Sequence, residues 1–154
     1  MPQFPANIDL SSLNGSNGFK TNGGAAFAST GDVNGDGAPD LIVGDQAGVH
    51  IVFGPSNGFG ANVDVTALNG TNGFSVPFPG TSASWGTSIS TADVNGDGFA
   101  DLIIGVATAD PGAPYPADSG SAYVVFGKPS GFTATVDLAA LNGADGFKLS
   151  GPTA

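Results

Sequence analysis

The sequence lacks cysteine and glutamate altogether, and it carries only one histidine and three basic residues. Without cysteine there are no disulfides, zinc–thiolate sites or thiol nucleophiles. All 13 acidic residues are therefore aspartates, which form helices poorly, favour turns and serve as oxygen ligands. The formal charge of −10 would repel phosphate backbones, so we expect no nucleic-acid partner. An acidic surface can instead attract cations or aid solubility.

Long apolar runs are also missing. The longest, such as Ala122–Phe126, are far too short to span a bilayer, so we expect no membrane insertion. The opening segment Met1–Pro5 has neither a basic nor an apolar stretch, so we expect no signal peptide in this segment. A chain of 154 residues with 40% hydrophobic content can bury one modest core.

Glycine, by contrast, is abundant: 26 of the 154 residues are glycine, against a usual share of about 7%. The glycines recur at matching places beside short apolar runs, which indicates ordered repeats rather than disorder. Three kinds of segment repeat. They are an acidic loop with the strand after it (32–44 and 93–105), an aromatic strand end (50–54 and 123–127), and a Leu-Asn-Gly segment ending in Phe (13–19, 68–74 and 141–147).

Between these markers lie short runs with strand character, about four in each repeated unit, joined by turns rich in Gly, Asn and Asp. The expected strands cover 25–31, 40–44, 49–53 and 73–76 in the first unit, and 87–92, 101–106, 121–126 and 146–149 in the second. Four-stranded units repeated at this length predict an all-β fold of β-propeller blades rather than a sandwich.

The repeats divide the chain into an extra outer strand with its lead-in (1–20), a first blade (21–76) and a second blade (77–151). The acidic loops are 61 residues apart and the aromatic strand ends 73 residues apart, so the second blade carries an insertion at 108–119. Three prolines in this insertion rule out a central strand and predict a surface loop.

Two blades cannot close a ring, because propellers use about 4–8. An open ring would leave apolar blade faces and strand edges exposed. Three explanations remain: the chain is a fragment of a longer array, it completes a ring as a homo-oligomer, or it was engineered to test such assembly. Because the terminal units carry no obviously polar cap, we favour the homo-oligomer.

The two acidic loops have the pattern Asp-x-Asn-x-Asp-Gly-x-x-Asp, from Asp32 to Asp40 and from Asp93 to Asp101. Carboxylate, amide and carbonyl oxygens are the ligands that calcium takes at about 2.3–2.6 Å. Closely spaced carboxylates repel one another, so a cation is expected to hold each loop compact. An EF-hand needs Glu at its twelfth position and flanking helices, but Val43 or Ile104 stands there, within β-branched strand sequence. The EF-hand is therefore rejected.

These loops, with the Asp-Leu-Ile strand that follows each, Trp85-Gly86 and Gly105–Ala107, resemble FG-GAP repeats, the blades of integrin-α-like β-propellers. The first blade departs from the pattern outside its acidic loop, with Gly24-Ala25 and Gly44–Gln46 in the corresponding places. The resemblance implies two structural calcium ions per chain, bound with an affinity of about 10⁻⁴–10⁻³ M. It implies the ligands Asp32, Asn34, Asp36, the Ala38 carbonyl and Asp40, and Asp93, Asn95, Asp97, the Phe99 carbonyl and Asp101.

No catalytic group stands out beside these loops. His50 lacks the spacing of a catalytic triad and aligns with Tyr123, so we expect it in an ordinary strand position. We expect Trp85 and the phenylalanines in packing roles, and Asp9, Asp64 and Asp137 in turns or at strand edges.

The sequence therefore predicts a non-catalytic, calcium-binding module that serves protein binding or adhesion outside the cell or at its surface. The alternative is an enzyme or a lectin-like sugar-binding protein on the same propeller, with the 108–119 insertion as its recognition loop and a glycan as its ligand.

Overall fold

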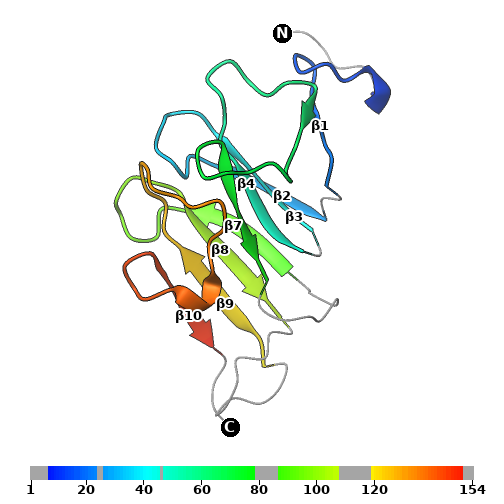
Figure 1. The fold of residues 1–154 in the computed structure, drawn as a ribbon. Helices are drawn as coiled ribbons and strands as arrows, with labels where there is room; N and C mark the ends of the chain where they lie inside the picture. The colour runs from blue at the N-terminus through cyan, green and yellow to red at the C-terminus, as the bar shows by residue number, and fades with distance from the viewer. Residues whose placement is uncertain (1–6, 24–25, 46, 79–86, 108–118, 151–154) are drawn as a thin grey trace.

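The chain is described here by a computed structural model, which covers all residues except 1–6, 24–25, 46, 79–86, 108–118 and 151–154. Two four-stranded antiparallel sheets lie next to each other, with the N-terminal segment on the far side of the first sheet (Figure 1). The prediction of an all-β fold with two four-stranded blades is confirmed.

The strands of each sheet follow one another in chain order from one edge to the other. The first sheet has the order β2 (Phe27–Gly31), β3 (Asp40–Gly44), β4 (Gly48–Val52) and β6 (Gly73–Pro77). The second has the order β7 (Thr87–Ala92), β8 (Asp101–Val106), β9 (Ser121–Val125) and β10 (Gly146–Ser150). The turns of β2–β3 and β7–β8 are short and rich in Gly and Asp. The predicted strands agree with these bounds to within a residue or two.

The remaining elements are short. Strand β1 (Lys20–Thr21) pairs in parallel with β5 (Asn62–Val63). Single 3₁₀ turns at Leu10–Ser12 and Leu138–Ala140 each begin at an aspartate, Asp9 or Asp137, whose side chain accepts a hydrogen bond from the main chain. The prediction of turn roles for these aspartates is thereby confirmed, although the 3₁₀ turns themselves were not expected.

The main hydrophobic core lies between the two sheets. Buried side chains of the first sheet, such as Ile42, Ile51 and Phe74, belong to one cluster with Leu102 and Ile104 of the second. A smaller cluster covers the opposite face of the first sheet, where Leu41, Val43 and Val52 pack with Val63 and Val65. Most strand residues of the first sheet are therefore buried on both faces, which explains their continuous apolar sequence.

Two sequence expectations fall outside the described residues: Trp85-Gly86, and the insertion except for Ser119. Within the part of the chain that the structure describes, no helix is long and apolar enough to cross a membrane.

Candidate metal centre

Each acidic loop joins the first two strands of its sheet: one loop connects β2 to β3, and the other connects β7 to β8. Two glycines in each loop have positive φ, +72° and +84° at Gly35 and Gly37, and +79° and +92° at Gly96 and Gly98. Residues other than glycine rarely adopt this backbone conformation. The glycines thus allow each loop to curl so that its polar side chains face the main chain of the same loop.

In the first loop, three side chains converge on the curled backbone. Asp32 accepts hydrogen bonds from the N–H groups of Asp36 (3.1 Å) and Gly37 (2.9 Å). The Asp36 N–H also donates to Asn34 Oδ1 at 3.1 Å, and Asn34 Nδ2 donates to Asp36 Oδ2 at 2.9 Å. The oxygens of Asp32, Asn34 and Asp36 therefore lie within one turn of chain.

The second loop repeats this network. Asp93 accepts from the N–H groups of Asp97 (3.1 Å) and Gly98 (2.9 Å). Asn95 Nδ2 donates to Asp97 Oδ2 at 2.8 Å, and Gly96 adds an N–H bond to Asp93 at 2.7 Å. Because the same contacts form in both blades, they follow from the shared loop sequence and not from either blade's surroundings.

The last aspartate of each loop differs from the others because it is fully buried. Asp40 accepts from the N–H groups of Val33 (2.8 Å) and Gly54 (2.9 Å), and Asp101 accepts from Val94 (2.8 Å) and Gly127 (2.9 Å). Each carboxylate thus links the start of its loop to the residues that follow the third strand of the same sheet, β4 or β9. This role could not be predicted from the sequence, because the hydrogen-bond partners are main-chain groups.

Burial raises the pKa of Asp40 above its ordinary value, although the main-chain N–H groups of Gly54, Val33 and Asn34 oppose the shift, and the nearby charge of Asp36 raises it further. A cation beside Asp36 and Asp40 would remove this repulsion. Each Asp40 oxygen uses one lone pair for its N–H bond and keeps a second. The donor set is therefore rich in hard oxygens, as calcium requires.

As the loops stand, no three His, Cys, Asp or Glu side chains among the described residues form an arrangement that could hold a metal. Their oxygens accept main-chain N–H groups instead. The side chains have the chemistry of calcium ligands. To bind an ion, Asp32, Asn34 and Asp36 would have to rotate so that some of their oxygens point away from the backbone and towards the ion. The first loop borders an open hollow of about 400 Å³ that includes Asp36 and Phe59, so an ion can reach it from solvent.

The two loops have unequal surroundings. The carbonyls of Asp32 and Val33 accept hydrogen bonds from the N–H groups of Ala100 (2.9 Å) and Lys128 (3.0 Å) in the second blade, and a side chain on Gly35 would meet the Phe99 ring. Val33 is 1% exposed, whereas its counterpart Val94 is 48% exposed. The second blade therefore holds the first loop in place, while the second loop faces solvent.

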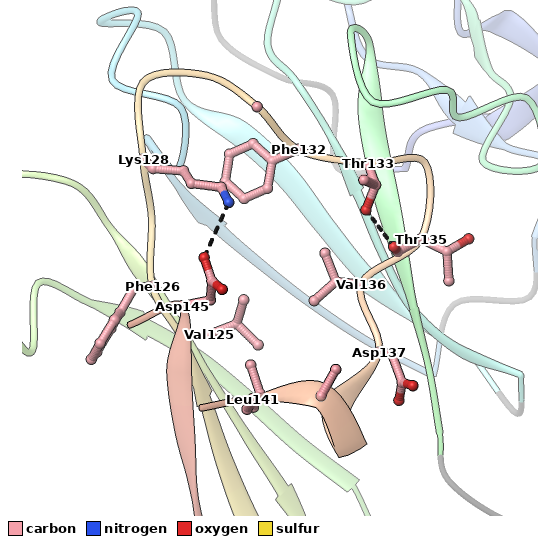
Figure 2. A pocket seen from close by; sticks show the side chains of 12 residues that line it. Val125, Phe126, Lys128, Phe132, Thr133, Thr135, Val136, Asp137, Leu141 and Asp145 are labelled. Atoms are coloured by element: carbon pink, nitrogen blue, oxygen red, sulfur yellow. Dashed lines mark hydrogen bonds and ion pairs between the residues drawn. The ribbon is translucent and has the colours of Figure 1, made fainter. Parts of the chain in front are cut away.

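Outside the loops, His50 lies in β4, as expected, with Nδ1 3.0 Å from Ser75 Oγ and Nε2 3.5 Å from Asp45. A pocket of about 340 Å³ lies beside Phe132, with Val125, Val136 and Leu141 in its lining (Figure 2). Lys128 and Asp145 in its lining form an ion pair of 3.4 Å, and Thr133, Thr135 and Asp137 add further polar groups.

Comparison with known proteins gives two matches to protein families. An FG-GAP-like repeat matches residues 32–104, and an FG-GAP repeat matches residues 85–125. Together they span both acidic loops and strands β3 to β9. No curated protein and no solved structure gives a significant match.

Proposed function

Because the chain belongs to the FG-GAP repeat family, we propose that it is a non-catalytic β-propeller module whose two acidic loops each bind a structural calcium ion. The observation that carries this proposal is the repetition of one hydrogen-bond network in both loops, with aspartate and asparagine oxygens gathered at the same three positions. Calcium takes carboxylate and amide oxygens of this kind as ligands.

In the first loop the ligands are Asp32, Asn34, Asp36 and Asp40 with the Ala38 carbonyl, and the second loop supplies their counterparts. The ion supplies positive charge between carboxylates that otherwise repel one another. The protein supplies the glycine-dependent curl and the buried Asp40 or Asp101, which anchors the loop to the third strand. Calcium would therefore hold the β2–β3 and β7–β8 hairpins in place.

The module serves protein binding or adhesion, and its blades complete a larger array by self-association. FG-GAP repeats are typical of extracellular and surface proteins, so we place the module outside the cell or at its surface. The exposed outer face of the second blade, with Val94 and Leu149 uncovered, supports the self-association. The recognition loop required by a sugar-binding function lies mostly outside the described residues.

Thermal unfolding with and without calcium tests the metal sites. With a dissociation constant of about 10⁻⁴–10⁻³ M, about 5 mM calcium stabilises each occupied site by about 1–2 kcal/mol. Two sites should then raise the melting temperature by roughly 5–15 °C over that in chelator. Magnesium is the control, because its smaller octahedral shell fits such a loop poorly. An identical melting temperature in calcium and in chelator would refute the proposal.

A further inference from the structure

The chain contains three copies of one element, the fourth strand of a blade with the turn before it. Strand β6 is the fourth strand of the first blade and β10 that of the second. The N-terminal copy includes β1, and Leu13–Lys20 matches Leu141–Lys148 in the pattern Leu-Asn-Gly-x-x-Gly-Phe-Lys. Among the described residues, β1 belongs to no four-stranded sheet.

Where the first blade meets the second, the β6 copy docks on residues 132–135 of the second blade. We call such a docking segment a seat. Ser75 N–H donates to the Ala134 carbonyl at 2.9 Å, and Ser75 forms a parallel bridge with Thr135. The Phe74 ring stacks on Phe132 with centroids 4.4 Å apart. Gly70, in the turn before β6, lies so close to the Phe132 carbonyl that a side chain would not fit.

The β1 copy sits on the equivalent seat of the first blade through the same contacts. Lys20 N–H donates to the Ala61 carbonyl at 3.0 Å, and the Phe19 and Phe59 rings lie 5.0 Å apart. Gly15 is packed against the Phe59 carbonyl as Gly70 is against that of Phe132. The seat formed by residues 59–63 therefore accepts a fourth strand and is filled from within the chain.

The β10 copy has no seat among the described residues. Nothing lies within 4 Å of the position of a side chain on Gly143, the counterpart of Gly15 and Gly70. Leu149 is 56% exposed, whereas its counterpart Val76 is 0% exposed between the two blades. Within the described residues, one fourth strand therefore has no seat and one seat is already taken.

We propose that the seat at residues 59–63 is the docking site for β10 of a second copy of this chain, and that residues 7–22 cover it until that copy arrives. The occupant follows from the junction between the two blades, where an equivalent strand meets an equivalent seat. Since β1 already lies against the Ala61 carbonyl and the Phe59 ring, an incoming β10 would need the same space, and the two strands exclude each other. This inference rests on the self-association proposed above and adds a competition that limits it.

Asn22 strengthens the hold of the covering segment. Its Nδ2 donates to Asp64 Oδ1 at 2.6 Å, and its Oδ1 accepts from Val65 N–H at 2.9 Å. The corresponding residue of the β6 copy is Pro77, the last residue of that strand, whose side chain cannot form such hydrogen bonds. The Asn22 side chain belongs to neither four-stranded sheet and bonds to Asp64 and Val65 just after β5, so its removal leaves the hydrogen bonds within both four-stranded sheets in place.

Sedimentation of the full chain in calcium, over a range of protein concentrations, tests the competition. Asn22→Ala should lower the concentration of half-association about tenfold, because two hydrogen bonds that favour the covered state are lost. The matched control is Leu10→Ala, in the same segment but 67% exposed, which should leave it unchanged. Adding Leu149→Asp to Asn22→Ala should reverse the gain.

The outcomes separate the two proposals. Association that is equal or weaker in Asn22→Ala than in the unmodified chain overturns the covering role and leaves self-association standing. If Asn22→Ala and Phe19→Ala both remain monomeric at the highest concentration, the docking site and the self-association both fall. The calcium sites are judged separately, by the thermal shift, and do not depend on either result.

Discussion

At the scale of single residues, the acidic loops contain two kinds of aspartate. Asp36 is exposed and its hydrogen bonds lie within its loop, whereas Asp40 is fully buried and joins the loop to Gly54, just after β4. The first kind is available to an ion, and the second is needed for the fold whether or not an ion is present. Both were predicted as ligands from the sequence, and only the structure separates them.

Asp40→Asn should therefore destabilise the chain by about 1–3 kcal/mol even in chelator, since an amide nitrogen cannot accept one of the two buried N–H bonds. Asp36→Asn is the control and should change stability in chelator by no more than about 0.5 kcal/mol. Denaturant unfolding of both variants measures the difference. Equal losses in chelator would show that Asp40 has no structural role of its own.

A second residue-scale prediction concerns Gly35 and Gly96, which have the same place in their loops and similar φ values of +72° and +79°. Replacing either with alanine strains the backbone by about 1 kcal/mol. Only at Gly35 would the new methyl group also collide with the Phe99 ring. Gly35→Ala should therefore lower the free energy of unfolding more than Gly96→Ala; equal effects would contradict the packing of Phe99 on the first loop.

At the scale of elements, the junction between the blades determines which surfaces are buried. Strands β2 and β7 approach each other there, and the Thr91 hydroxyl donates to the Thr30 carbonyl at 2.8 Å. The first loop supplies two carbonyls to the same junction. The second blade thus packs against the first loop and buries part of it. A further blade in the same position beside the second blade would cover the second loop in the same way.

The matched pair Val33 and Val94 tests this view. Val33→Ala should cost about 2 kcal/mol, the transfer free energy of the buried methyl groups with a cavity term. Val94→Ala should change stability by less than about 0.5 kcal/mol in the monomer. Both values come from urea unfolding at a protein concentration low enough to prevent association. A large loss for Val94→Ala would mean that its face is already covered in the monomer.

These elements also show which structural features can be predicted from the sequence. The acidic loops mark the second strand of each blade, and the alternation of apolar and turn residues places β3, β7 and β8 at their observed bounds. Val33 and Val94, however, lie in the same Asp-Val-Asn-Gly-Asp-Gly context and differ in exposure because only one has a neighbouring blade. Local sequence cannot encode that difference, nor the parallel pairing of β1 with β5, since both depend on residues distant in the chain.

At the scale of the whole molecule, one face of the second blade and one seat on the first blade are complementary but lie at opposite ends of the two-blade unit (Figure 1). A head-to-tail contact between such surfaces closes into a ring when the rotation per copy divides a full turn, and otherwise forms a filament. The covering segment 7–22 would keep this growth reversible.

The central claim is that each acidic loop binds one calcium ion, and calorimetric titration with calcium tests it most directly. The unmodified chain should bind two ions per chain with dissociation constants of about 10⁻⁴–10⁻³ M. Asp36→Asn and Asp97→Asn should each remove or greatly weaken one site, and the double variant should lose both. Two ions bound, falling to one and then to none, is the predicted result; a chain that takes up no calcium, or a double variant that still binds two ions, would contradict the account.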